Sequence, residues 1–171
     1  MKEWIIRPEA PSDFDSVEEI HRAAFGRPDE AHLVSELRKR AKPTLSLVAE
    51  ASGSLLGHVM FSPVTIEGPK APPPSVGLAP LAVMPDAERQ GIGSALVRTG
   101  LRDCLPMGWR VVFLLGDPGY YFRFGFELAA AQGLRYESEA FDAGFQFIEL
   151  VPGASSGMSG WVRYHEAFAH V

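Results

Sequence analysis

The sequence has almost no cysteine and no long apolar run. A single cysteine, Cys104, in 171 residues excludes an internal disulfide framework. No segment reaches the roughly 18 consecutive apolar residues that a membrane-spanning helix needs. The charges and prolines of residues 1–14 do not fit the apolar centre of a signal peptide. From these absences we expect a cytoplasmic protein without a membrane partner.

Positive charge and metal-binding clusters are also scarce. The formal net charge is −5 at pH 7, which argues against nucleic acid as a partner. No His, Cys, Asp and Glu residues recur at the spacing of a metal site, so we expect no metal. The composition is otherwise that of a globular protein with 46% hydrophobic residues. A length of 171 residues predicts one well-cored domain spanning residues 1–171.

The segment from Leu78 to Leu105 organises the chain. Its first part is apolar and predicts a strand buried on both faces, although Pro80 should interrupt the ladder of hydrogen bonds. From Ile92 the apolar residues recur at helical spacing. Gly91 and Gly93 stand where that helix begins, so several backbone N–H groups could face an anion there. A tight turn explains the two glycines as well, and their spacing alone leaves both interpretations open.

A second apolar strand supports the anion site. The segment from Arg110 to Leu115 is rich in β-branched and aromatic residues, as expected of a central strand. Two such strands joined by a helix predict a parallel pair, formed here by Leu78–Met84 and Arg110–Leu115. Ligands of open sheets bind at the carboxyl ends of parallel strands, and the turn at Gly91 lies at such an end.

The rest of the chain predicts further strands and helices. We expect helices at residues 12–25, capped by Ser12, and at 29–41, then a hairpin of strands 45–50 and 55–66. Later strands are expected at 145–151 and, as a final edge strand, within 161–168. The predicted fold class is α/β: a single domain with a mixed, mostly antiparallel sheet, one parallel strand pair and helices on both faces.

Two segments resemble the motifs of a known superfamily. LAVMPDAERQGIGSALV resembles motif A, and GDPGYYFRFGFE resembles motif B, of the GNAT superfamily of acetyl-CoA-dependent N-acetyltransferases. Together with GHVMFSPV they are most similar to its YhbS-like branch. The resemblance covers nearly the whole chain. It departs from the family pattern at Glu88, which occupies a position that usually holds Gln or Arg.

The resemblance implies a co-substrate and the residues that bind it. In this superfamily, backbone N–H groups of motif A hold the pyrophosphate of acetyl-CoA. The strand that precedes them holds the thioester carbonyl, here through an N–H near Ala82 or Val83. The expected binding residues are Leu81, Ala82, Val83, Arg89, Gln90, Gly91, Ile92, Gly93 and Ser94. The acceptor would be a primary amine of a small molecule or a peptide, and a homodimer is left open.

The resemblance also assigns the catalytic acid. Tyr121 lies five residues before Phe126, as does the tyrosine that commonly protonates the departing thiolate in the superfamily. A phenol can do this because its ordinary pKa near 10 keeps it protonated at neutral pH. Tyr120 is the alternative. For the base we name His58, with a water held by Glu67 as the other candidate. A domain that binds or senses acyl-CoA without catalysis is the rival function, which Glu88 keeps open.

Overall fold

The structure is a computed structural model that describes residues 3–171. The chain forms two compact units. Unit 1 comprises the residues up to Ser62, then 79–103 and 166–171, and unit 2 comprises 63–78 and 104–165. The strands β3 (Ser54–Glu67) and β4 (Ser75–Val83) each run from one unit into the other.

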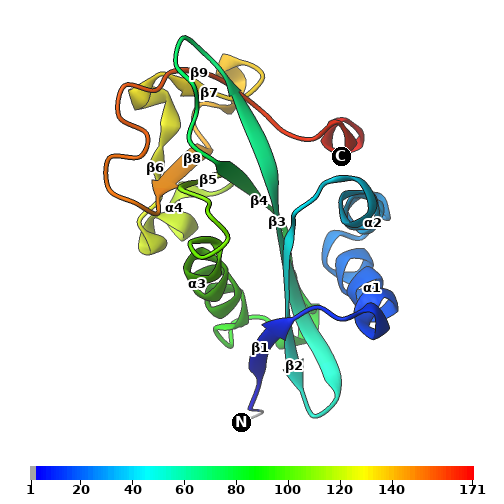
Figure 1. The fold of residues 1–171 in the computed structure, drawn as a ribbon. Coiled ribbons are helices and arrows are strands. Elements are labelled where there is room, and N and C mark those ends of the chain that lie inside the picture. The colour runs from blue at the N-terminus through cyan, green and yellow to red at the C-terminus, as the bar shows by residue number, and fades with distance from the viewer. Residues whose placement is uncertain (1–2) are drawn as a thin grey trace. The chain divides into compact units, whose positions relative to one another are not determined.

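Unit 1 has helices on both faces of its strands. Its other elements are β1 (Ile5–Pro8), α1 (Phe14–Phe25), α2 (Asp29–Arg40), β2 (Leu45–Ala51) and α3 (Ile92–Cys104). β1 pairs with β2 and β2 with β3, all antiparallel, so the predicted hairpin is confirmed. Figure 1 shows α1 and α2 on one side of these strands and α3 on the other.

The two faces of β3 pack against different helices. On one face Met60 joins Val48 and residues of α1 and α2, including Val17 and Leu37, in one apolar cluster. On the other face Gly57 has no side chain, and a Cβ built there would lie 3.0 Å from side-chain atoms of Ile92 and of Leu96. Because the side chains of a strand alternate between its faces, Gly57 faces α3 and His58 must face α1.

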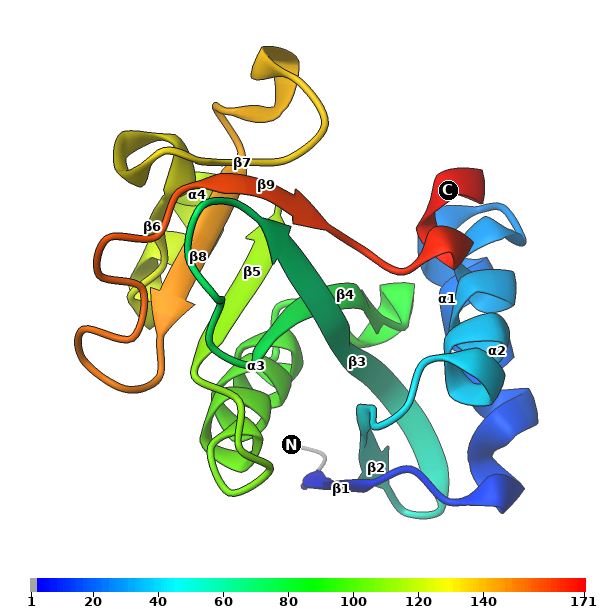
Figure 2. The same ribbon diagram turned by 45° about the horizontal axis from the view of Figure 1, so that its top comes forward.

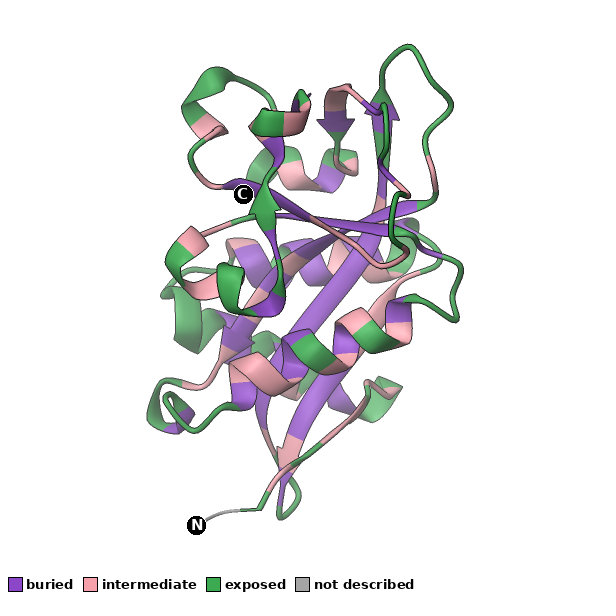
Figure 3. Cartoon of the chain, turned by 90° about the vertical axis from the view of Figure 1, so that its left-hand side faces the viewer, coloured by how far each residue is buried: buried purple, intermediate pink, exposed green. Residues whose placement is uncertain are grey.

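Unit 2 is built around two largely buried strands, β5 (Val111–Leu115) and β8 (Phe145–Glu149). Its other elements are α4 (Pro118–Tyr121), β6 (Glu127–Leu128), β7 (Leu134–Arg135) and β9 (Gly160–Arg163). β8 lies antiparallel between β5 and β6, and Figure 2 shows it alongside β5. The aromatic rings of Phe113, Phe145 and Phe147 pack together in the core. Figure 3 shows long buried stretches along the strands, whereas the helices mix buried, intermediate and exposed residues.

The predicted parallel pair is confirmed, but its range was wrong. β4 pairs with β5 from Ser75↔Val111 to Gly77↔Phe113. The paired residues of β4 therefore precede the predicted strand of 78–84, and the pairing ends before Pro80. A second parallel pairing, between β7 and β9, was not predicted.

Two other local predictions were wrong. Ser12 lies within a 3₁₀ helix, Pro11–Asp13, and makes no cap of α1; the Asp13 carboxylate instead accepts the Ala10 N–H at 2.7 Å. The predicted final edge strand is β9, which is no edge because it pairs with β3 on one side and β7 on the other. The prolines at positions 8 and 11 favour a 3₁₀ turn before α1, and the partners of β9 come from distant segments that its own sequence does not specify.

Candidate functional site

The turn between β4 and α3 has the geometry expected of a phosphate site. A 3₁₀ helix, Pro85–Ala87, follows β4, and Arg89 and Gly91 then adopt positive φ angles of 62° and 83°. Gly91 is exposed, and a Cβ built on it would meet no atom within 4 Å. Gly91 is therefore needed for its left-handed backbone, while the space above it is open.

The first turn of α3 supplies the donors. The hydrogen bond from the Ala95 N–H to the Gly91 carbonyl, at 3.0 Å, closes this turn. The N–H groups of Ile92, Gly93 and Ser94 precede it and point along the axis of a 13-residue helix toward its positive end. The Ile92 side chain, at the first residue of α3, is buried and lies close to Gly57 of β3. Arg89 and Gln90 are exposed beside these groups, as is Glu88.

The strand residues predicted to bind the thioester lead directly into this turn. Leu81, Ala82 and Val83 are the last residues of β4, with Ala82 buried and the other two half-buried. Immediately after them the Met84 N–H donates to the Leu56 carbonyl at 2.8 Å, which ties the end of β4 to β3. All of these groups belong to unit 1. The structure thus places all of the residues predicted to bind acetyl-CoA in one strand–turn–helix segment of unit 1.

Tyr121 lies in unit 2, at the end of α4. Asp117 caps this helix by accepting the Gly119 N–H at 2.9 Å, and Gly125 ends the aromatic segment with a φ of 100°. The Tyr121 ring contacts Tyr120 edge-on, with centroids 4.9 Å apart, and Phe126 at 6.0 Å. Burial of the phenol, with a smaller contribution from Tyr120, raises the pKa of Tyr121 to about 12. The hydroxyl is therefore protonated at neutral pH.

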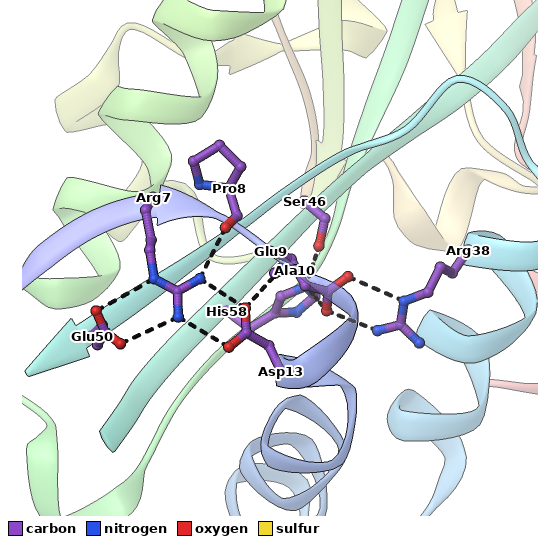
Figure 4. Close-up of polar contacts among 9 residues, drawn as sticks. All are labelled: Arg7, Pro8, Glu9, Ala10, Asp13, Arg38, Ser46, Glu50 and His58. Atoms are coloured by element: carbon purple, nitrogen blue, oxygen red, sulfur yellow. Dashed lines mark hydrogen bonds and ion pairs between the residues drawn. The ribbon is translucent and has the colours of Figure 1, made fainter. Parts of the chain in front are cut away.

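His58 lies in a buried chain of polar groups. Its Nε2 is 2.8 Å from the Ser46 Oγ and its Nδ1 is 2.8 Å from the Nε2 of His21 in α1. Both imidazoles are fully buried. Figure 4 shows the Ser46 contact beside Glu9, which accepts two hydrogen bonds from Arg38. A fully buried ring does not touch a substrate in this conformation. Proton abstraction by His58 therefore stays a prediction, and it requires this row of hydrogen-bonded polar groups to open.

The sequence analysis missed the partner of His58. His21 and His58 are 37 residues apart, and only the packing of α1 on β3 brings them together. The helical spacing of His21 with Val17 and Ile20, both buried, is the signal that could have indicated an inward position. The other base candidate, Glu67, is exposed and paired with Arg163, with 3.2 Å between Oε2 and Nε.

Two kinds of feature are absent from residues 3–171. This part of the chain contains no group of three or more His, Cys, Asp and Glu side chains arranged to hold a metal ion. Within the same residues no helix has the length and apolar character required to cross a membrane. Cys104 is buried in α3, as its helical spacing predicted.

Comparison with known proteins identifies the class. A family model described as an acetyltransferase (GNAT) domain matches residues 5–129. The chain therefore belongs to the GNAT family of acetyltransferases, and it is an acyltransferase of the N-acetyltransferase type. The mixed α/β fold, with its parallel pair of β4 and β5, agrees with this membership.

Particular relatives cover nearly the whole chain. YhbS of Escherichia coli strain K12, named an uncharacterized N-acetyltransferase, is 41% identical over 165 residues, which are 96% of this chain and 98% of YhbS. A crystal structure of E. coli YhbS in complex with CoA matches with a TM-score of 0.91 and 38% identity, covering 99% of this chain and 93% of that one. A GNAT acetyltransferase from Brucella melitensis in complex with acetyl-CoA matches with a TM-score of 0.79 and 36% identity, covering 98% and 99%.

Proposed function

We propose that this chain transfers the acetyl group of acetyl-CoA to a primary amine of a small molecule or a peptide. The observation that carries the proposal is the turn at Arg89 and Gly91, both with positive φ, where a Cβ built on Gly91 would meet no atom within 4 Å directly before α3 begins. Helix N-termini of this kind bind phosphate groups. The proposal is supported by the relatives from E. coli and Brucella, which hold CoA and acetyl-CoA.

The reaction is a direct transfer between two bound substrates. The neutral amine attacks the thioester carbonyl carbon, so a C–N bond forms, the C–S bond breaks and its electron pair leaves on sulfur. In the proposal a backbone N–H near Ala82 or Val83 stabilises the negative charge that develops on the carbonyl oxygen. Holding both substrates in a reactive arrangement contributes much of the rate enhancement.

Two proton transfers complete the reaction. Tyr121 donates its phenolic proton to the departing thiolate and recovers it from the solvent. The attacking nitrogen loses a proton, and His58 or a water held by Glu67 is the proposed acceptor. Because its ring is fully buried, His58 could serve only if the chain of polar groups that includes His21 and Ser46 opens. A homodimer is a separate prediction, on which this chemistry does not depend.

A non-catalytic domain that senses acyl-CoA is the rival function. Glu88 keeps it open, because it departs from the family pattern and a carboxylate beside a pyrophosphate is unfavourable unless it points away. Glu88 is exposed and has an extended backbone that leads away from the 3₁₀ helix. That exposure leaves its carboxylate free to turn toward solvent, which is compatible with acetyl-CoA binding and catalysis.

The test is acetyl transfer by the parent chain and by Tyr121→Phe. Acetyl-CoA is incubated with amino acids, polyamines, aminoglycosides and peptides, and acetylated products are detected by mass. Tyr121→Phe keeps the packing of the ring and should lower kcat about 10²-fold or more while leaving acetyl-CoA binding intact. Tyr120→Phe is the matched control and should lower kcat less.

Each arm of this test can fail separately. Binding of acetyl-CoA with no acetylated product from any amine would favour the sensing function. A full kcat for Tyr121→Phe on the best amine would remove Tyr121 as the acid while leaving the acetyltransferase assignment in place.

A further inference from the structure

The ring of Tyr121 lies against a backbone that has no room for a side chain. A Cβ built on Gly116 would lie 2.6 Å from the Cε2 atom of Tyr121 and 3.1 Å from its Cδ2 atom. Both distances are shorter than ordinary van der Waals contact. The position of the Gly116 backbone therefore sets the position of the phenol ring, and with it the position of the hydroxyl.

The Gly116 backbone is in turn held by a buried amide. Its N–H donates to the Gly144 carbonyl at 3.0 Å, and its own carbonyl accepts from Gln146 Nε2 at 3.1 Å. Gln146 Nε2 also donates to the Gly144 carbonyl, at 3.1 Å. Gln146 is fully buried, and its two donations join the residue after β5 to the residue before β8. We call Gln146 with its two carbonyl acceptors the amide clamp.

The orientation of the Gln146 amide follows from its neighbours. If the amide were flipped, its oxygen would face two carbonyl oxygens, which is unfavourable. In the observed orientation Oε1 has no hydrogen-bond partner among the described residues. A buried amide that leaves its acceptor unsatisfied costs free energy. Its donors go to the carbonyl of Gly116, which lies against Tyr121, and to that of Gly144, which is itself bonded to Gly116. Packing alone would be served as well by an apolar residue of similar length.

We propose that Gln146 and Gly116 are positioning residues for Tyr121: the amide clamp holds Gly116 where the phenol ring packs, and so directs the hydroxyl toward the thiolate that it protonates. This inference rests on the proposed role of Tyr121 as the acid. It adds to that role the requirement for a donating side chain at position 146 and for glycine at position 116. Neither residue touches a substrate in this account, and both act through the ring.

The experiment replaces the clamp without changing its volume. Gln146→Met keeps the length of the side chain and removes both donors, and Gly116→Ala pushes on the ring directly. The matched control is Gln132→Met in the same unit, because the Gln132 amide also donates to a backbone carbonyl, that of Ser155. Gln146→Met should lower kcat about tenfold or more with acetyl-CoA affinity unchanged, since a displaced acid loses its alignment. Gln132→Met should keep the parental kcat.

Two further readouts separate positioning from a merely structural role. In the Tyr121→Phe background, Gln146→Met should lower kcat no further, because the hydroxyl through which it acts is gone. The protein is labelled with ¹³C at Cζ of tyrosine, and the Tyr121 resonance is assigned by its loss in Tyr121→Phe. The chemical shift of this resonance should show that the Tyr121 hydroxyl ionises at lower pH in Gln146→Met than in the parent. The reason is that burial raises the pKa of Tyr121, and a released ring regains solvent.

The outcomes distinguish this inference from the function on which it rests. A parental kcat and a parental Tyr121 titration in Gln146→Met would overturn it. An equal loss of kcat in the Tyr121→Phe background would overturn it as well, because the clamp would then act elsewhere. If Tyr121→Phe keeps the parental kcat, Tyr121 is not the acid. The pH titration of Tyr121 then decides whether the amide clamp orients the ring. Should Gly116→Ala not fold, Gln146→Met carries the test.

Discussion

Gly91 combines a left-handed backbone with open space, and the two properties can be separated by substitution. Gly26, which ends α1 in the same unit, has the same combination: a φ of 68° and no atom within 4 Å of a built Cβ. Asparagine tolerates positive φ better than other residues with a side chain. Gly91→Asn and Gly26→Asn therefore impose a similar backbone cost, but only the first places a side chain above the N–H groups of α3.

We predict that Gly91→Asn weakens acetyl-CoA binding and that Gly26→Asn does not. For the parent, a ligand at 100 times its Kd adds about 2.7 kcal/mol to the free energy of unfolding. For a protein of this size that raises Tm by roughly 5–10 °C. A tenfold loss of affinity would halve the stabilisation to about 1.4 kcal/mol. Thermal unfolding with and without acetyl-CoA measures the rise in Tm that the ligand causes in each variant. Equal rises in the two variants would mean that the turn does not contact acetyl-CoA.

At the scale of elements, α1 packs on β3 through two histidines that are uncharged at neutral pH. Donation from His21 Nε2 to His58 Nδ1, and from His58 Nε2 to Ser46, leaves only His21 Nδ1 without a partner among the described residues. In these tautomers His21 Nδ1 is unprotonated and carries a lone pair. In the opposite tautomers it would carry a buried N–H group without an acceptor. A proton added to the pair would have to occupy this unpartnered nitrogen.

The groups around the pair set the direction of its titration. Burial lowers the pKa of His21 to about 4, with Arg38 adding to the effect and Glu30 opposing it. Burial, His21 and Arg38 lower the pKa of His58 well below its ordinary value. Glu9 lies 3.8 Å from His58 Nε2 and is itself bonded to Arg38. The folded protein therefore binds fewer protons at these histidines than the unfolded chain does.

We predict that acid destabilises the parent more than His21→Gln. As pH falls below about 6.5, the unfolded chain protonates His21 while the folded protein does not. Stability present above that pH is lost progressively down to about pH 4, by up to about 3 kcal/mol for His21 alone. Glutamine can still donate to His58 but does not titrate, so denaturant unfolding between pH 7 and 5 should lose about 2 kcal/mol less.

His32→Gln is the control for this experiment. His32 is an exposed histidine of α2, and its replacement should leave the pH profile of stability as in the parent. The same profile for His21→Gln and the parent would mean that the histidine pair accepts protons in the folded protein. The hydrogen-bonded tautomers described above would then be wrong.

Elements could be predicted where the residues that start and end them lie close together in the sequence. The segment from Asp117 to Gly125 shows this, because a cap, a proline at the first helical position and a left-handed glycine all act within a few residues. β7 has two residues, Leu134–Arg135, which is too short to show a period, and only its pairing with β9 defines it. Its existence therefore depends on contacts between distant segments, which the local sequence does not encode.

The same division applies to the candidate site across the whole molecule. The turn at Gly91 and the position of Tyr121 could be predicted because each lies within one continuous motif. The contact of His21 with His58 and that of Gln146 with Gly116 join residues 37 and 30 positions apart. Glutamine and histidine at such positions are also common on surfaces, so nothing in their types separates a buried role from an exposed one.

The two units share strands, and this bears on how the protein unfolds. β3 passes from unit 1 into unit 2 after Ser62, and β4 returns from unit 2 to unit 1 after Leu78. Loss of order in one unit therefore removes structure from strands that the other unit needs. We predict one cooperative transition for residues of both units, as expected of a single domain.

The prediction is tested with probes that report each unit separately. Far-UV circular dichroism follows mainly α1, α2 and α3 of unit 1, and in Trp4→Phe the fluorescence of Trp109 and Trp161 follows unit 2. The two midpoints should coincide. Leu134→Ala in the core of unit 2 should cost about 2–5 kcal/mol and lower both midpoints together. If only the fluorescence midpoint fell, the units would unfold independently, and a single domain spanning residues 1–171 would be the wrong description.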